Sequence, residues 1–294
     1  MYLATIMCDS IRIKCLIVYI LLFFEVVTAM SMSSLSRDGP VIPRESIFSA
    51  WYSEVTTLMN EKESSWKNLD VPEEYGGGGS VKVGVLGPRG QGQKEIAFVS
   101  EAFKSNRLDY ARMVSFSGCG YDVFNLLLMP SMDSCLPIFG ADIVCLPGGA
   151  LAAIDFQPSK DGYSECDYYD SKLYAPYKDI FCKWQKKLPL GGKLPEAAQK
   201  YFSPHAIWTR IPAPLENNSV LLEDVRASLL ECLSAYLDLS NLGYDEAALK
   251  PNPEFVEGYL RYRIENDPAK NLLVGAFGKA WTDSALEQIL FPAK

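Results

Sequence analysis

The sequence predicts an α+β protein, an α/β/α sandwich with one central antiparallel sheet flanked by helices. Two observations carry this prediction. Five apolar runs follow one another through the middle of the chain, and most gaps between them are far shorter than the dozen residues that a parallel crossover needs. Apolar residues at helical spacing dominate the C-terminal part of the chain instead. The expected strands of this meander are 96–99, 111–116, 123–129, 138–146 and 150–156.

Further elements are expected before and after the meander. Residues 81–86 and 206–211 are expected to form strands, and the longer gap from Ser100 to Tyr110 is expected to hold a helical turn. Amphipathic helices are expected at 43–62, with Ile47, Trp51, Val55 and Leu58 on the apolar face, and at 222–236, 253–266 and 282–290.

Composition limits the class of protein. Of the 294 residues, 48% are apolar, which is enough for one sizeable core. We therefore expect a single domain from residue 44 to residue 294. The formal net charge of −8 argues against broad electrostatic binding to nucleic acid. A Lys-rich stretch from Lys183 to Lys200 interrupts this acidic background, and its pattern fits either a solvated face or a docking patch.

Cysteine and histidine usage limits the chemistry. The cysteines are scattered without a C-x-x-C pair, so we expect free or buried thiols rather than disulfides. His205 is the only histidine, which excludes a two-histidine iron centre and argues against a metal site. A hydrolase triad of Ser203, His205 and a carboxylate is disfavoured because the chain has no Gly-x-Ser-x-Gly motif. The Gly-rich stretch at 87–95 lacks the Gly-Lys-Ser/Thr of a phosphate-binding loop.

The first residues have the pattern of a targeting leader. Arg12 and Lys14 precede the apolar run 15–24, and the small residues Thr28 and Ala29 follow it. A Ser-rich, acid-poor segment comes next, which is typical of an organelle transit segment. We expect residues 1–43 to be a cleaved signal peptide plus transit segment that sends the protein to a plastid, with no membrane attachment after processing. An uncleaved membrane anchor is the alternative.

Two aspartates are candidate proton donors. Asp155 lies inside an apolar strand, where a desolvated carboxyl group has a raised pKa and can hold a proton for transfer. Alternation along the strand could equally turn Asp155 toward solvent, or Asp155 could cap a turn. Asp267 precedes Pro268 at a helix end, where it could serve as a proton donor or only as a helix cap.

The order and spacing of several short segments resemble the ferredoxin-dependent bilin reductases. The resemblance runs from about Trp51 to the C-terminus. The segments are Leu108 to Arg112, Val123 to Pro130, Leu136 to Asp142, Ala153 to Pro158, Tyr201 to Pro204, Trp208 to Arg210, Asn266 to Ala269, and Phe277, Gly278 and Trp281.

The resemblance implies a linear tetrapyrrole (bilin) substrate held between the sheet and the C-terminal helices. It also implies that no cofactor is bound by the protein and that electrons arrive singly from a reduced 2Fe-2S ferredoxin, each coupled to protonation of a substrate radical. Further partners would be other bilin reductases or lyases. A bilin-binding carrier without redox turnover is the alternative from another class.

The resemblance also implies site residues. Asp155 matches the family's central proton-donating aspartate by position, and Asp267 resembles the second aspartate of members that reduce the A-ring system. The substrate-binding residues that it implies are Asn125, Phe156, Gln157, Arg210 and Arg263. The sequence around Asp155 resembles that of the family branch that converts 15,16-dihydrobiliverdin to phycoerythrobilin. The branch that makes 15,16-dihydrobiliverdin from biliverdin is the alternative. The branch that uses a histidine-aspartate pair is less similar, because the segment before Leu136 contains Cys135 and lacks a histidine.

Overall fold

A computed structural model describes residues 46–87, 94–134, 136–160, 174–241 and 251–292. The expected leader, residues 88–93 of the Gly-rich stretch, Cys135 and Cys166 lie outside the described residues. The expectations for these segments therefore stay predictions.

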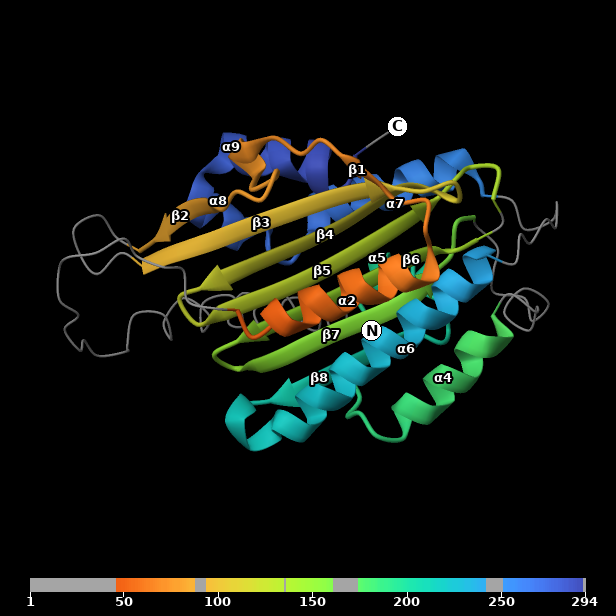
Figure 1. The fold of residues 1–294 in the computed structure, drawn as a ribbon. Coiled ribbons are helices and arrows are strands. Elements are labelled where there is room, and N and C mark those ends of the chain that lie inside the picture. Colours follow the sequence, from red (N-terminus) through yellow and green to blue (C-terminus); the bar gives the residue numbers. More distant parts are fainter. Residues whose placement is uncertain (1–45, 88–93, 135, 161–173, 242–250, 293–294) are drawn as a thin grey trace, which may run out of the picture. The chain divides into compact units, whose positions relative to one another are not determined.

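An antiparallel eight-stranded sheet forms the centre of the described chain (Figure 1). Its order is β1-β3-β4-β5-β6-β7-β8, and β2 also pairs with β3. This sheet confirms the predicted meander and the α+β class. The strands are β1 (Lys67–Leu69), β2 (Lys82–Leu86), β3 (Lys94–Lys104), β4 (Leu108–Gly118), β5 (Tyr121–Pro130), β6 (Ile138–Leu146), β7 (Gly149–Gln157) and β8 (Ile207–Pro212).

The helical turn expected between Ser100 and Tyr110 is wrong. Strand β3 continues to Lys104 and β4 begins at Leu108, so a tight turn joins them. The backbone N–H of Ser105 donates to the carbonyl of Leu108 at 2.9 Å and closes this turn. Ala102 is buried against the sheet's helical cover, and burial of such small residues supports a strand that the weakly apolar sequence does not suggest.

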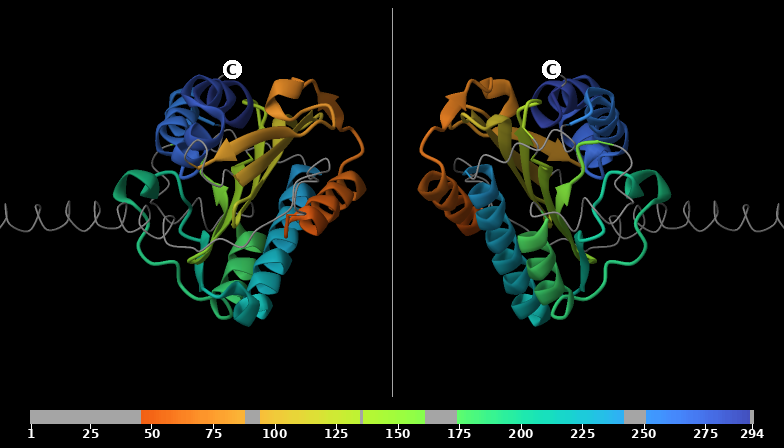
Figure 2. Two further views of the ribbon diagram at one scale, coloured as in Figure 1. Left: turned by 90° about the vertical axis from the view of Figure 1, so that its left-hand side faces the viewer. Right: turned by 90° about the vertical axis from the view of Figure 1, so that its right-hand side faces the viewer.

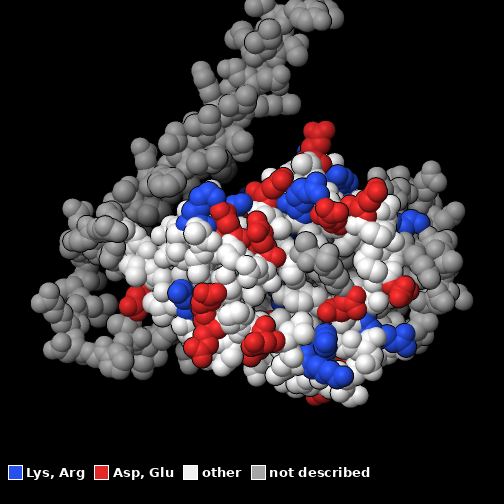
Figure 3. All heavy atoms as spheres, turned by 90° about the horizontal axis from the view of Figure 1, so that it is seen from above, with Lys and Arg blue, Asp and Glu red and all other residues white. Residues whose placement is uncertain are grey.

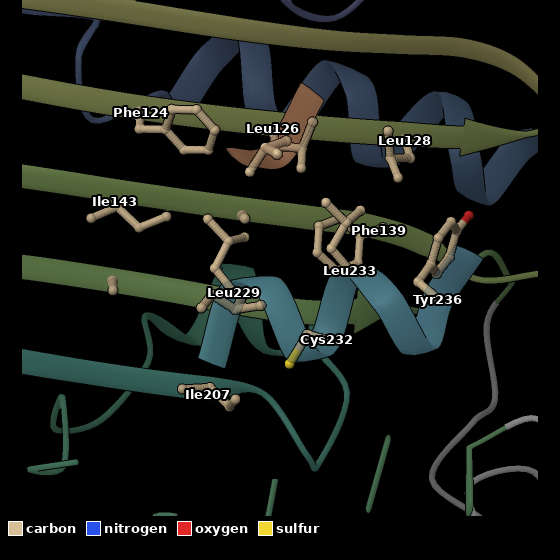
Figure 4. Close-up of a cluster of buried hydrophobic side chains, with 14 of the residues drawn as sticks. Phe124, Leu126, Leu128, Phe139, Ile143, Ile207, Leu229, Cys232, Leu233 and Tyr236 are labelled. Carbon is tan, nitrogen blue, oxygen red and sulfur yellow. The ribbon is translucent and has the colours of Figure 1, made fainter. Parts of the chain in front are cut away.

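Three helices cover one face of the sheet: α2 (Ser49–Lys62), α4 (Ala175–Gln185) and α6 (Ser219–Asn241) (Figure 2). Helix α6 inserts Leu229, Cys232 and Leu233 toward side chains of β5, β6 and β8 (Figure 4). Helix α2 buries Trp51, Val55 and Met59, which recur every four residues. The expected role of Ile47 in this stripe is wrong, since Ile47 precedes the helix and is 45% exposed.

Helices on the opposite face come from the end of the chain. They are α7 (Pro253–Asn266), α8 (Lys270–Phe277) and α9 (Lys279–Ala285), which runs into the π-helical turn η4 (Leu286–Leu290). The predicted bounds of α7 match the structure, whereas the helix predicted at 282–290 changes from α to π geometry after Ala285. Shorter elements are η1 (Glu73–Tyr75), α5 (Glu196–Gln199) and η2 (Leu215–Asn218). Two helical layers around one sheet confirm the predicted sandwich.

The cysteines that the structure describes are free thiols, as expected: Cys119, Cys145, Cys182 and Cys232. Among the described residues, no group of three or more His, Cys, Asp or Glu side chains could hold a metal ion. In the same part of the chain, no helix combines the length and apolar character needed to cross a membrane.

Candidate functional site

Alternation along the strands collects polar side chains on the face covered by α7 to η4. On β4, β5, β6 and β7, every second residue packs into the cluster under α2, α4 and α6. The intervening positions therefore face the C-terminal helices. They include Arg112, Asn125, Asp142, Asp155 and Gln157.

A small cavity of about 30 Å³ lies between this face and the C-terminal helices. Its polar walls are Asn125 of β5, Asp142 of β6 and Asp267 at the end of α7, and its apolar walls include Phe98 and Leu273. Asn125 and Asp142 are direct partners in the β5–β6 register, so their side chains stand next to each other. A space of this size accepts water-sized molecules. A larger ligand needs more space than this cavity offers.

Arg263 of α7 joins the two carboxyl groups of the cavity. Its Nη2 lies 2.7 Å from Oδ2 of Asp142 and 4.0 Å from Oδ2 of Asp267. Because Asp142 takes the shorter contact, Asp267 is the less compensated of the two carboxyl groups. Burial raises the pKa of Asp267, and the nearby Arg263 charge opposes that rise. Asp267 can thus hold a proton closer to neutral pH than an exposed aspartate can.

Local backbone geometry explains the position of Asp267. Pro268 disfavours helical backbone at the residue before it, and α7 ends at Asn266. Oδ1 of Asp267 accepts a hydrogen bond from the backbone N–H of Ala269 at 2.8 Å, so the side chain also closes the turn into α8. Asp267 therefore both caps this turn and lines the cavity, so the two roles that the sequence left open do not exclude each other.

Asp155 is fully buried, so the alternative that it faces solvent is wrong. Its Oδ2 accepts the backbone N–H of Ser203 at 2.7 Å, and its Oδ1 accepts the Ser203 hydroxyl at 2.5 Å. The hydroxyl of Tyr177 lies 3.5 Å from Oδ1. Burial raises the pKa of Asp155 to about 7, against the opposing effect of the Ser203 hydrogen bonds. Both oxygens of the Asp155 carboxyl group are thus hydrogen-bonded to the protein, next to the loop before β8. Asp155 is not among the residues that line the cavity.

A second chain of contacts leads from the cavity toward β7. The hydroxyl of Tyr259 donates to Oε1 of Gln157 at 2.6 Å, and Nη1 of Arg263 lies 3.4 Å from the Tyr259 hydroxyl. Gln157 lies across Gly140, where a Cβ atom would come within 2.8 Å of Oε1. A side chain at residue 140 would therefore displace Gln157.

The structure brings some predicted site residues together and separates others. Asn125 and Asp267 line the cavity, Arg263 lies beside it in contact with Asp267, and Gln157 is linked to Arg263 through Tyr259. Phe156, also expected at the substrate, is separated from these residues. It is fully buried on the opposite face of the sheet, where its ring stacks on Tyr177 at a centroid distance of 4.0 Å. Consecutive residues of a strand point to opposite faces, so Phe156 cannot share the Asp155 face.

Arg210 is placed away from the cavity as well. It is exposed on the outermost strand β8, and its Nε donates to the carbonyl of Gly191 at 2.9 Å. This position does not support direct contact with a ligand in the cavity.

Sequence reasoning missed two site residues, Arg112 and Asp142. Both are charged residues inside apolar strands, which is the signal that singled out Asp155. Arg112 is fully buried. Applying the same criterion to every strand would have found them.

Comparisons with known proteins agree with this architecture. The family described as "Ferredoxin-dependent bilin reductase" matches residues 82–292. The phycoerythrobilin:ferredoxin oxidoreductase of Synechococcus sp. (strain RCC307) is 34% identical over 201 residues, which are 67% of this chain and 75% of that protein. The enzyme of the same name from Nostoc punctiforme is 35% identical over 207 residues, 69% of this chain and 78% of that protein.

A solved structure shares the fold. The crystal structure of tomato phytochromobilin synthase in complex with biliverdin superposes with a TM-score of 0.67 at 24% identity, covering 83% of this chain and 82% of that one. The match at 82–292 spans most of the described sheet and all the C-terminal helices. The chain therefore belongs to the ferredoxin-dependent bilin reductases, a family of oxidoreductases that act on bilins.

Proposed function

We propose that this chain reduces 15,16-dihydrobiliverdin to phycoerythrobilin with two electrons from reduced 2Fe-2S ferredoxin. Each electron is followed by a proton, so the reaction passes through a substrate radical and needs proton donors close to the bilin. The observation that carries the proposal is the pair of carboxyl groups, Asp142 and Asp267, that flank one cavity on the sheet. The relatives named phycoerythrobilin:ferredoxin oxidoreductase support this choice of reaction.

Asp267 is the proposed donor for the reduction that yields phycoerythrobilin. It is buried, its pKa is raised by that burial, and its Oδ2 is left 4.0 Å from the nearest guanidinium nitrogen of Arg263. Asp142 stands across the cavity as the second carboxyl group. Two acids on different elements can deliver protons to different atoms of an extended substrate.

Asp155 is the second candidate for the central proton donor. Its pKa of about 7 and its position on the same sheet face favour the role, whereas its three side-chain and backbone partners from Ser203 and Tyr177 favour a structural one. Asp142 is preferred because it lines the cavity. Matched Asp142→Asn and Asp155→Asn variants separate the two assignments, because loss of the donor that serves the bilin stalls the reaction at a radical seen by electron paramagnetic resonance.

Substrate contacts are assigned to the polar side chains around the cavity. Asn125 lines the cavity and Arg263 contacts the Asp142 and Asp267 carboxyl groups of its wall, so both would contact the bilin, and Gln157 would do so after Tyr259 moves with α7. Phe156 supports the sheet from behind through its stack on Tyr177. Arg210 would contact only an outer part of the bilin, at the edge of the sheet.

Ferredoxin is the proposed electron donor, and the Lys-rich stretch is its proposed docking surface. Lys186 and Lys193 are exposed there, whereas Lys183 is paired with Glu231 at 2.6 Å. Acidic and basic side chains alternate on the face shown in Figure 3, so that face presents no patch of one sign. A local basic patch would steer an acidic partner most strongly at low salt.

The proposed setting is a plastid. The pattern of residues 1–43 supports a cleaved leader, with a mature domain from residue 44 to residue 294. Other bilin reductases or lyases are the proposed recipients of the product.

One anaerobic assay tests the reaction. The chain is incubated with ferredoxin, a reducing system and either biliverdin or 15,16-dihydrobiliverdin, and products are separated by chromatography. We expect phycoerythrobilin to form from 15,16-dihydrobiliverdin and no product to form from biliverdin. Conversion of biliverdin to 15,16-dihydrobiliverdin would instead assign the chain to the alternative branch. A single change in the absorption spectrum without product would identify a bilin carrier.

A further inference from the structure

Arg112 is a buried arginine of β4 that the proposed reaction does not use. Its Nη1 donates to Oδ1 of Asn125 at 2.5 Å, and its Nε donates to the carbonyl oxygen of Leu290. Asn125 and Leu290 both line the cavity, and Arg112 lies one layer behind them. Arg112 therefore contacts the wall of the site and not its contents.

The chemistry of arginine fixes the orientation of the Asn125 amide. A guanidinium group has five N–H donors and no acceptor, so the Asn125 atom that faces Arg112 must be the oxygen. The Nδ2 group then points away from Arg112. Asn125 is 7% exposed and lines the cavity, so this N–H₂ group is the part of the amide that a ligand in the cavity would meet.

We propose that Arg112 is a positioning residue that locks the Asn125 amide with its N–H₂ group toward the cavity. The locked amide makes the site select a hydrogen-bond acceptor on the substrate, which on a bilin is a lactam carbonyl oxygen or an unprotonated ring nitrogen. This inference rests on the proposed function for the identity of the substrate. A site with a fixed donor discriminates strongly, because a ligand without an acceptor leaves that donor buried and unpaired.

A purely structural role for Arg112 makes a different prediction. Its bond to Leu290 and the position of its guanidinium carbon, 4.9 Å from the Phe291 ring centroid, also hold the C-terminal turn against the sheet. Tyr110 holds the same turn independently, since its hydroxyl donates to the carbonyl of Ile289 at 2.6 Å. Tyr110→Phe therefore loosens the turn without touching Asn125, and it is the matched control.

The test combines Arg112→Lys, Asn125→Asp, the double variant and Tyr110→Phe in the full chain. Lysine keeps the positive charge but cannot bond two acceptors as a planar fork. Asn125→Asp keeps an oxygen toward Arg112 and replaces the cavity-facing donor with an acceptor. We expect a loss in kcat/KM of about tenfold for Arg112→Lys. We expect at least that loss for Asn125→Asp, and no further loss in the double variant, because both changes remove one interaction.

Binding of 15,16-dihydrobiliverdin, followed by its absorption spectrum without ferredoxin, gives a readout that does not depend on turnover. Asn125→Asp should weaken binding and shift the absorption maximum, and this variant decides the matter if Arg112→Lys does not fold. Unchanged binding by Asn125→Asp, additive losses in the double variant, or an equal loss in Tyr110→Phe would each overturn the positioning role. A parent chain that binds no bilin would overturn the proposed function, and with it the substrate named here.

Discussion

The buried carboxyl group of Asp155 should make a contribution to the stability of this protein that falls as pH rises from 4 to 7. Its pKa is raised from the usual 3.8 to about 7 because the folded chain removes it from water. Between these two values the folded state keeps a proton that the unfolded state has lost. The contribution of Asp155 to the free energy of unfolding is then largest below pH 4 and decreases as pH rises toward 7. About three pH units at about 1.4 kcal/mol each give an upper limit of about 4 kcal/mol for the whole effect.

Asp155→Asn removes this titration and keeps the shape of the side chain. The amide oxygen can still accept the backbone N–H of Ser203, and its N–H₂ group can donate to the Ser203 hydroxyl oxygen. From pH 5 to pH 8, the stability of the variant relative to the parent should therefore increase by roughly 2–3 kcal/mol.

Urea unfolding at pH 5, 6, 7 and 8 measures this difference, with the exposed Asp133→Asn as the control variant. The control should follow the parent at every pH. Parallel pH profiles for the parent and Asp155→Asn would refute the claim that burial holds Asp155 protonated.

Three further outcomes are expected. Asp267→Asn should bind 15,16-dihydrobiliverdin like the parent but lose phycoerythrobilin formation by at least about a hundredfold in the anaerobic assay, and a parent rate would remove Asp267 from the mechanism. Lys186→Glu should slow ferredoxin-driven turnover most at low salt. The control Lys104→Glu, at an exposed position at the end of β3, should leave turnover unchanged. The same salt dependence in both variants would exclude the docking surface. Gly84→Ala would place a Cβ atom 2.6 Å from the Phe277 ring and should lower the free energy of unfolding by about 1–3 kcal/mol, with no such loss for Gly148→Ala, which has open space around it.

Much of the fold follows from local pattern in the sequence. The short gaps between apolar runs require antiparallel neighbours, and Pro253 and Pro268 delimit a helix whose bounds match the prediction. The gap from Ser100 to Tyr110 does not predict the strand that continues to Lys104, because Ala102 and Phe103 are the only apolar residues from Ser100 to Lys104. Pairing with β4 stabilises that segment as a strand, and pairing is not a property of the segment itself.

The sequence also identified single residues with unusual chemistry. The sequence placed the Asp155 carboxyl group inside an apolar strand but left open whether it faces solvent, and the structure shows it buried with hydrogen-bond partners. The identity of its partner was decided only by the tertiary structure, because Ser203 comes from a loop 48 residues further along the chain.

The cavity itself is a product of tertiary structure alone. Asp142 and Arg263 are 121 residues apart, and they meet because the chain returns at its end to lay α7 across β6. Sheet register then decides which strand positions share that face: it sets Asn125 beside Asp142, and strand alternation turns Phe156 to the other side. Sequence therefore determined most of the strands and helices, and long-range packing decided which polar residues are buried and which of them meet, because contact between distant segments depends on the geometry of the whole sheet.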